Sequence, residues 1–365
     1  MPANRPSDVV LALQSAEPDP PIPGASRPFA ASDFLDAAGG LAVRRASPAE
    51  LSRDAAGTLF VHPAWLGTYG LEDLVVVEGP ARREGAARLV FARRDDHLVH
   101  LGRLTWLDAD CVAVLTDRLL GLDGVAFVVF EDVRVEGALA RRPGQSVFHY
   151  QNNWQLVLNG PGETDRIARQ TAQATARKLR GLTRDREGVR IGFDRDPSGR
   201  FLRTVVAYNR LKIEAQGRRH GIDEAEFARL SALSAELGWG SVLEDKDGIV
   251  AGDLVFVTGR RAYFMTGGYD AAAQRYSPGM ITLIHAIEEC RRQGILDFNL
   301  MWGDGAYKQR LGAHCRPLVT IVARGSAAAL LRPSYLGALG RFGRLHLKRA
   351  LKPLARRLLR RGPEA

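Results

Sequence analysis

Cysteine is scarce in this chain of 365 residues, which holds Cys111, Cys290 and Cys315 and no others. Three widely separated cysteines are typical of a protein from a reducing compartment and argue against a disulfide framework. They also lack the paired spacing of a zinc site, because only His314 and Cys315 lie together. The sequence therefore predicts a protein without disulfides and without a metal.

Long apolar runs are also missing. No uninterrupted hydrophobic stretch approaches the roughly 20 residues that a membrane-spanning helix needs. The N-terminus carries Asp8, Glu17 and Asp19 among several prolines, whereas a secretory signal begins with a basic region and continues as an apolar core. We expect a cytoplasmic protein whose residues 1–30, rich in Pro, Ala and Ser, form a disordered N-terminal segment.

Three motifs of common enzyme classes are absent. The chain has no Gly-x-Gly-x-x-Gly run, no phosphate-binding loop with its Lys, and no Gly-x-Ser-x-Gly turn. These absences disfavour dinucleotide-dependent oxidoreductases, P-loop NTPases and α/β-hydrolases.

Positive charge is concentrated at one end of the chain. The net charge is +10, and the last 25 residues hold nine Lys and Arg side chains against one acid, Glu364. This segment carries +8, which leaves only +2 for the rest of the chain. Leu347, Leu351, Leu354 and Leu358 recur within it at spacings of four, three and four, as in a basic amphipathic helix.

Such a segment favours an anionic partner. An anionic membrane face attracts each nearby basic residue by about 1 kcal/mol, so we expect residues 341–361 to bind a membrane surface. Pro353 is expected to kink a helix here. Nucleic acid is a weaker candidate, because Phe342 is the single aromatic residue in the stretch. A disordered, solubilising tail is the remaining alternative.

Strand-like and helix-like segments alternate through the body of the chain. Strand signals occur at residues 71–78, 88–91, 97–101, 125–133, 154–158 and 239–244, and helix signals at 108–120, 164–187, 201–219 and 223–237. This order predicts an α/β or α+β fold. After the N-terminal segment we expect an N-terminal domain at 31–147, a second domain at 148–328 and a basic amphipathic tail at 329–365.

The clearest local signals lie between residues 276 and 312. Ser277 suits the N-cap of a helix, and Pro278 suits its first turn, where a missing N–H costs nothing. Apolar residues then recur at helical spacing until Gly294 ends the helix, which predicts a helix over 278–292. A short apolar run at 295–301 predicts a buried strand.

A hairpin is predicted upstream of this helix. Residues 248–257 and 262–266 read as two strands joined by a Gly-Arg-Arg turn. The local order is therefore strand, strand, helix, strand and a polar turn that leads into a short helix.

These residues resemble a known family. The likeness to the GNAT-fold acyltransferases of the cellulose-biosynthesis-associated (CelD-like) branch, relatives of the FemAB aminoacyl transferases, lies in Tyr276-Ser277-Pro278-Gly279, the strand ending at Asn299, Gly303-Asp304 and Tyr307-Lys308. It spans roughly residues 60–325. The resemblance implies an α/β (α+β), GNAT-like acyl-CoA N-acyltransferase fold with two tandem GNAT-like domains, the first degenerate and the second catalytic.

The resemblance also implies where a cofactor binds. In the GNAT fold the pyrophosphate of the acyl-CoA lies at the N-terminus of the helix that we place at 278–292, where N–H groups and the helix dipole favour an anion by roughly 0.3–1 kcal/mol for the dipole alone. The implied cofactor site is Arg275, Ser277, Gly279 and Met280, for acetyl-CoA or another acyl-CoA, with no metal. The alternative is that Ser-Pro-Gly is only a good helix start.

At the other end of the unit, the resemblance implies the catalytic residues. Tyr307 would protonate the leaving thiolate, Asp304 would serve as a base or hold the acceptor amine, and Lys308 would hold a phosphate or an acidic acceptor. The alternatives are a packed Tyr, an N-cap Asp and a solvated surface Lys. Two features depart from the family. Asn299 stands where Asp is common, and the usual Gly-rich pyrophosphate loop is absent.

The expected function is that of an acyl-CoA-dependent N-acyltransferase, and of an acetyltransferase in particular. Its acceptor would be an amine on a small molecule or saccharide, as a precursor of the cell envelope or of exopolysaccharide. Two alternatives stay open. One is FemAB-type aminoacyl transfer from charged tRNA, and the other is a non-catalytic scaffold that docks at the membrane, which the Asn at position 299 favours.

Overall fold

The computed structural model describes residues 28–35, 40–51, 58–71, 73–79, 87–159, 167 and 169–360, with the side chains of 352–360 left out. Most of the expected disordered segment 1–30 lies outside these residues. None of the helices in the described ranges is both long enough and apolar enough to cross a bilayer.

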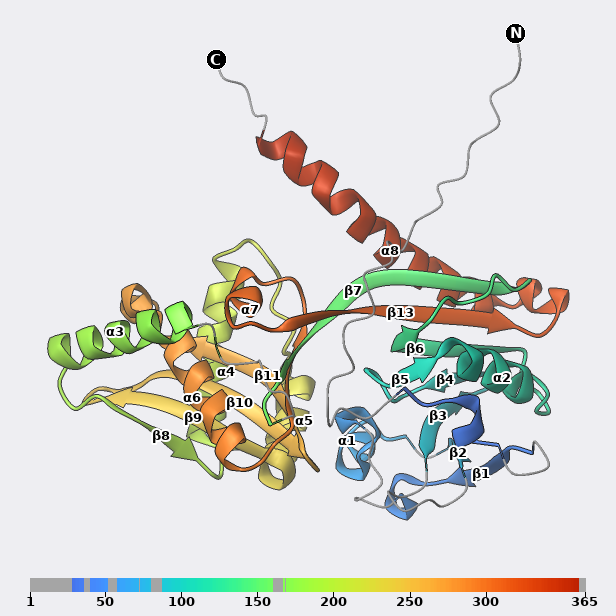
Figure 1. The fold of residues 1–365 in the computed structure, drawn as a ribbon, viewed down its shortest axis with the longest axis horizontal. Coiled ribbons are helices and arrows are strands. Elements are labelled where there is room, and N and C mark those ends of the chain that lie inside the picture. The colour runs from blue at the N-terminus through green and yellow to red at the C-terminus, as the bar shows by residue number, and fades with distance from the viewer. Residues whose placement is uncertain are drawn as a thin grey trace, which may run out of the picture.

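One mixed sheet runs through the whole molecule (Figure 1). Its N-terminal half consists of β1 (Ala42–Ala46), β2 (Leu74–Glu78), β3 (Arg88–Arg94), β4 (His97–His100), β5 (Trp106–Asp108) and β6 (Phe127–Glu136). Its C-terminal half consists of β8 (Arg190–Asp194), β9 (Gly238–Asp245), β10 (Gly248–Thr258), β11 (Arg261–Tyr269) and β12 (Asp297–Trp302). Two long strands, β7 (Gln145–Val157) and β13 (His314–Arg324), join the halves.

The strand order shows how the halves are connected. Along the sheet it is β1-β2-β3-β4-β6-β13-β7-β12-β11-β10-β9-β8, with β5 beside β6. The late strand β13 therefore lies between β6 and β7, antiparallel to both. The expected domain boundary at residues 147 and 148 falls within β7, and the limits of the two GNAT-like units stay a prediction.

Helices cover both faces of the sheet. The α-helices are α1 (Pro63–Gly67), α2 (Ala109–Leu120), α3 (Arg169–Asp185), α4 (Arg200–Glu214), α5 (Glu224–Leu237), α6 (Pro278–Arg292), α7 (Ala306–Arg310) and α8 (Pro333–Arg360). Short 3-10 helices are η1 (Ala31–Asp33), η2 (Pro48–Glu50), η3 (Leu59–Val61), η4 (Ala271–Tyr276) and η5 (Ala327–Leu331). In the C-terminal half, α4 and α5 share one apolar cluster with the sheet and α6 shares another.

Two glycines let α4 lie close to the sheet. A Cβ atom on Gly268 would stand 2.3 Å from the carbonyl oxygen of Val205, and one on Gly252 would stand 2.6 Å from the ring of Phe201. Both distances are shorter than any real carbon contact, so α4 can approach β10 and β11 only because these positions have no side chain. The opposite face of the sheet is thereby left to α6.

The predicted elements of the second domain are confirmed. The helix over 278–292 matches α6, and the hairpin matches β10 and β11, which pair antiparallel. The predicted strand at 295–301 is observed slightly later, as β12. In the N-terminal half, the helix signal at 108–120 corresponds to α2. Asp108 caps the N-terminus of this helix, because its side chain accepts a hydrogen bond from the N–H of Cys111.

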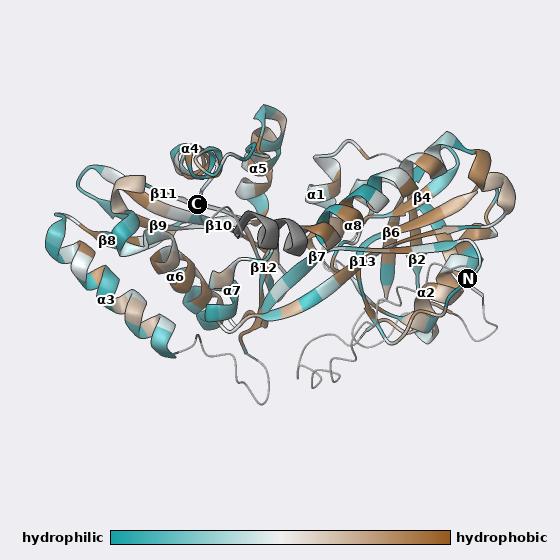
Figure 2. Cartoon of the chain, turned by 90° about the horizontal axis from the view of Figure 1, so that it is seen from above, coloured by the Kyte–Doolittle hydropathy of each residue, from teal (hydrophilic) through white to brown (hydrophobic). Residues whose placement is uncertain are grey.

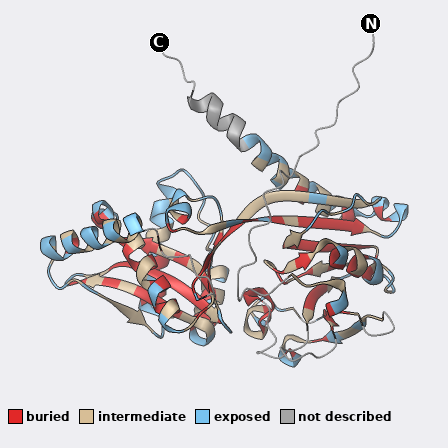
Figure 3. Ribbon diagram, viewed as in Figure 1, coloured by how far each residue is buried: buried red, intermediate tan, exposed pale blue. Residues whose placement is uncertain are grey.

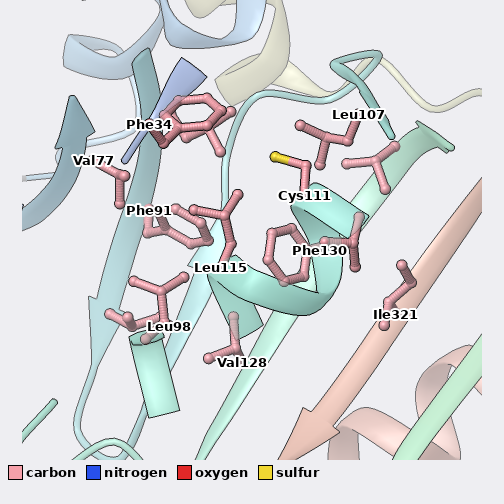
Figure 4. Close-up of a cluster of buried hydrophobic side chains, with 14 of the residues drawn as sticks. Phe34, Val77, Phe91, Leu98, Leu107, Cys111, Leu115, Val128, Phe130 and Ile321 are labelled. Carbon is pink, nitrogen blue, oxygen red and sulfur yellow. The ribbon is translucent and has the colours of Figure 1, made fainter. Parts of the chain in front are cut away.

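The N-terminal half has its own core beneath α2 (Figure 4). Leu115 and Cys111 of α2 point toward the rings of Phe91 and Phe130, and Ile321 of β13 joins the same cluster. Burial of a Leu or Phe side chain contributes roughly 1.5–3 kcal/mol. Because a residue of β13 completes this core, the N-terminal half depends on a strand from near the end of the chain.

Helix α8 differs from the predicted tail. It is continuous from Pro333 to Arg360 and is not broken at Pro353, while the kink expected there stays a prediction. Its first turns also belong to the folded body, because Tyr335 and Phe342 are buried against β6, β7 and β13. Along its described side chains α8 is otherwise mostly intermediate or exposed, as its tan and pale blue colours in Figure 3 show.

Candidate functional site

The site is organised by the separation of two parallel strands. β11 and β12 pair at only three positions, from Arg261 opposite Asp297 to Tyr263 opposite Asn299, and then part. Since the strands are parallel, their carboxyl ends lie at the same edge of the sheet. Helix α6 follows β11 after η4, and α7 follows β12. Both expected ends of the site, 275–280 and 304–308, therefore lie at this diverging edge.

A basic side chain contacts the residue that precedes α6. Ser277 precedes the helix with a positive φ of 51°, and its hydroxyl accepts a hydrogen bond from the ammonium of Lys178 on α3. Arg275 lies next to it, 3.3 Å from a carboxylate oxygen of Asp185. Lys212 of α4 lies 5.2 Å from the ring centre of Tyr269. Lys178 thus places one cation at the N-terminus of α6, which favours an anion there, while Arg275 is paired with Asp185.

Gly279 keeps this helix end open. A Cβ atom at Gly279 would lie 3.2 Å from the ring of Tyr269, so a larger side chain would fill the space between α6 and β11. Within the described ranges, no residue accepts a hydrogen bond from the N–H of Gly279. The N–H of Met280 donates to the carbonyl oxygen of Ser277 at 2.9 Å, so it is not free, and a place for Met280 in the cofactor site stays a prediction. One free N–H therefore remains where two were expected.

Asn299 is held by a neighbouring amide. Its Oδ1 accepts hydrogen bonds from Nδ2 of Asn153 at 2.7 Å and from the N–H of Met301 at 2.8 Å, and its Nδ2 donates back to Asn153. A carboxylate at this position would lose that donor. Asn299 therefore fixes β12 to β7 where the register of their pairing shifts.

Lys308 is neither on the solvated surface nor placed to hold a phosphate or an acidic acceptor, the two environments that the sequence analysis considered. It is buried, and its ammonium donates to the carbonyl oxygens of Leu300, Met301 and Trp302 at 2.7, 3.1 and 2.7 Å. The positive φ of Met301, 57°, turns these carbonyls toward it. Burial lowers the pKa of Lys308 to about 8, while the three contacts favour the charged form. Its donors hold the end of β12 and do not face a ligand.

Asp304 connects three segments near the surface. It accepts a hydrogen bond from Nδ2 of Asn152 on β7 at 2.9 Å, and Arg349 of α8 lies 4.0 Å from its carboxylate. The alternative of an N-cap is wrong, since Gly305 holds that position in α7. Asp304 is thus tied to β7 and α8.

Tyr307 lies on the α6 face of the sheet. It packs against the apolar cluster around α6, and burial, with a smaller effect from Asp253, raises the pKa of its phenol to about 12. A phenol with this pKa keeps its proton at neutral pH, as a proton donor must. Because the raised pKa makes this phenol a weaker acid than an ordinary tyrosine, the role of Tyr307 as general acid stays a prediction.

Asp253 is a residue that the sequence analysis missed. It lies in the middle of β10 and is fully buried, and its Oδ2 has no hydrogen-bond partner among the residues described. A Cβ atom on Gly267, the residue opposite, would stand 2.1 Å from its Oδ1. Burial raises the pKa of Asp253 to about 7. The signal in the sequence was a single acid within the apolar run GIVAGDLVFV.

A cavity of about 130 Å³ lies near the paired part of β11 and β12. Its walls include Arg261, Tyr263 and Asn299 from the C-terminal half, and His100 and Thr58 from the N-terminal half. No sequence motif marks it, because its walls come from segments up to about 290 residues apart, from Phe29 to Leu318. In the part of the chain that the structure describes, no group of His, Cys, Asp or Glu is arranged to hold a metal ion.

Comparison with known proteins agrees with this architecture. The family described as Acetyltransferase (GNAT) domain matches residues 169–309. Among solved structures, FemX is 11% identical with a TM-score of 0.55, and the match covers 80% of this chain and 99% of that one. No curated protein matches the chain.

Two further structures are similar at lower scores. One is L-PGS from Bacillus licheniformis, at 16% identity and a TM-score of 0.46, covering 76% of this chain and 91% of that one. The other is a tandem GNAT protein from the clavulanic acid biosynthesis pathway, at 10% identity and a TM-score of 0.40. That match covers 79% of this chain and 100% of the other.

The fold and the matched domain define the class of protein. The chain is a mixed α/β protein with the GNAT fold, and its architecture is that of tandem GNAT-like units. It is a transferase of the acyltransferase kind.

Asp253 makes stability depend on pH in a defined direction. Between about pH 4 and pH 7 the unfolded carboxyl has lost its proton while the buried one keeps it, so stability falls as pH rises through this window. Asp253→Asn removes the effect. We expect the variant to gain up to roughly 4 kcal/mol relative to the wild type between pH 4 and pH 7. Urea unfolding at several pH values measures this, and parallel profiles would contradict it.

Proposed function

We propose that this protein is an acyl-CoA-dependent N-acyltransferase, most simply an acetyltransferase, of the CelD-like branch. One observation carries the proposal: the N-terminus of α6, with Lys178 and Arg275 beside it, and the phenol of Tyr307 lie at the same diverging edge of β11 and β12. An anion site and a proton donor at one opening between strands are what transfer from a CoA thioester requires.

The residues at this edge suit the parts of an acyl-CoA. The N–H of Gly279, the dipole of α6 and the ammonium of Lys178 would hold the pyrophosphate. The space that a Cβ on Gly279 would fill leaves room for this approach. The bound acyl-CoA would supply the activated acyl group. Tyr307 would hold a proton on its phenol oxygen for the thiolate sulfur, and the apolar cluster around α6 would exclude water.

The acceptor follows from the resemblance alone. We propose an amine on a cell-envelope or exopolysaccharide precursor, modified in the cytoplasm. Asp304 is exposed at the same edge and is our candidate for holding that amine, while Lys308 would act indirectly by fixing the backbone of β12.

Two other functions have a specific observation in their favour. The similarity to FemX favours aminoacyl transfer from charged tRNA, as in the FemAB relatives. The locked amide pair of Asn153 and Asn299 favours a scaffold, since it leaves no carboxylate at the usual family position. The buried Asp253 on the same sheet weakens the second alternative, because a scaffold has no need of an acid with a raised pKa.

A substitution at Gly279 tests the cofactor site. Gly279→Leu places a side chain against Tyr269, and we expect it to weaken binding of acetyl-CoA at least 10-fold in calorimetric titration. Gly192→Leu is the matched control, because a Cβ atom there meets nothing within 4 Å. If the wild type binds neither acetyl-CoA nor a longer acyl-CoA, the proposal is wrong, and binding of charged tRNA would then favour the FemAB-type reaction.

Removal of one hydroxyl tests the general acid. Tyr307→Phe should lower kcat by about 10²-fold or more, the usual contribution of a positioned proton donor, and leave the Kd for acetyl-CoA unchanged. Steady-state kinetics with a thiol-detecting reagent measures kcat, and calorimetry measures the Kd for acetyl-CoA. An unchanged kcat would return Tyr307 to a packing role.

A further inference from the structure

Exposed apolar side chains gather in η5 and α8. Of the nine large apolar side chains that are exposed in the described part of the chain, six lie between residues 330 and 351. They are Leu330, Leu331, Leu336, Leu345, Leu347 and Leu351. Single exposed leucines are ordinary on a protein surface, whereas such a gathering marks a surface that meets a partner.

One side of α8 is fixed to the folded body. Tyr335 and Phe342 are buried in one apolar cluster with residues of β6, β7 and β13. Farther along the helix, a ring nitrogen of His346 forms a hydrogen bond with the backbone N–H of His149 on β7 at 3.1 Å. These contacts set the orientation of α8 on the sheet, and they therefore also set the direction in which its other side points.

The other side of α8 carries a stripe of leucines. Leu347 and Leu351 follow Leu336 by 11 and 15 residues, which at 3.6 residues per turn keeps all three within about 60° of one another. Tyr335 and Phe342 point at least about 100° away from them. The three leucines are 57%, 49% and 53% exposed, in the order given. In the view from above (Figure 2), α8 lies over β7 and presents hydrophobic and hydrophilic residues side by side.

The charge beside the leucine stripe is positive. The sequence of α8 contains no Asp or Glu. Arg344 and Lys348 are exposed beside the stripe, and no acid in the described part of the chain pairs with either of them. Arg341 pairs with Glu131 of β6 at 3.3 Å and so belongs to the contacts that hold the helix. Arg344 and Lys348 thus add positive charge next to the leucines.

We infer that α8 docks this protein on an anionic lipid bilayer, with the leucine stripe in the bilayer and with Arg344 and Lys348 at its charged surface. Leucines beside Arg and Lys on one helix are the composition of interfacial helices, in which apolar burial and attraction to anionic lipid act together. Nucleic acid is the competing partner, and it would use the charge but not the leucines. The inference goes beyond the proposed function, because it names a surface for a partner and needs no acyl-CoA.

Docking through α8 would hold the diverging edge of β11 and β12 close to the bilayer. Arg349 of α8 lies 4.0 Å from the carboxylate of Asp304, in the turn before α7. The thiol of Cys315 lies near both: burial raises its pKa, and the charges of Asp304 and Arg349 also act on it. Since a helix with its side chains is about 10–12 Å across, a bilayer on the outer side of α8 lies roughly that far from this turn.

Co-sedimentation with lipid vesicles tests the docking. The full chain should bind vesicles of phosphatidylcholine mixed with phosphatidylglycerol, bind pure phosphatidylcholine far less, and lose affinity as salt is added. Leu347→Gln combined with Leu351→Gln removes the apolar contact and keeps the charge, so it should weaken binding at least about 10-fold. Arg344→Gln combined with Lys348→Gln keeps the leucines and should weaken binding roughly 30-fold, the attraction expected for two basic residues at an anionic surface.

The matched control lies on α4. Leu211 is 64% exposed, and Arg210 beside it is exposed. Arg210→Gln combined with Leu211→Gln should therefore leave vesicle binding unchanged. Equal binding by the wild type and the leucine variant of α8 would overturn the inference, and so would binding of duplex DNA without binding to vesicles. Dimers that need these leucines, seen by sedimentation velocity in a wild type that does not bind vesicles, would overturn it too.

A fluorescent label on Cys315 tests the placement of the edge. Cys315 is exposed, whereas Cys111 and Cys290 are buried, so a thiol-reactive dye modifies the folded chain at one position. Vesicles with a spin-label quencher on their headgroups should quench this dye when the protein binds. The comparison is Gly192→Cys combined with Cys315→Ser, since β8 is four strands from β12 and a Cβ atom at Gly192 meets nothing within 4 Å. Quenching at position 315 that is no stronger than at position 192 would contradict the placement.

Discussion

The bend at the end of β12 depends on one ammonium group. The ammonium of Lys308 donates hydrogen bonds to three successive backbone carbonyl oxygens at the end of β12. The Asn153–Asn299 amide pair fixes the strand just before these carbonyls. Hydrogen bonds to a charged group contribute roughly 1.5–3 kcal/mol each. These contacts fix the end of β12 just beyond the point where its pairing with β11 stops, and α6 and α7 follow from the two separated strand ends.

Two buried polar groups lie on opposite faces of this sheet. Asp253 on one face and His100 on the other each pay a desolvation cost that an apolar residue would avoid. Structural positions of comparable burial, such as Leu254 and Phe256, are apolar. The two faces are thus specialised differently: an acid with a raised pKa lies on the α6 face, and a neutral imidazole among arginines lies on the other.

The sequence predicted those features that depend on local chemistry. Helix α6, its proline at the first turn and the β10–β11 hairpin follow from spacing and capping within about fifteen residues. Lys308 was placed at the surface or on a ligand because it follows a polar turn, and only the positive φ of Met301 brings the carbonyls to it. The Asn153–Asn299 pair joins residues 146 apart, which no periodicity can reveal.

The place of β13 in the sheet constrains the order in which the chain can fold. Strand β6 is made early in synthesis, but one of its neighbours is made only when residues 314–324 emerge. Until then, the edges of β6 and β7 that later receive β13 are open to other strands. Such long-range pairing folds slowly, since a large loop must close first. The two halves therefore complete one another late, and a fragment ending before β13 would leave the N-terminal core without Ile321.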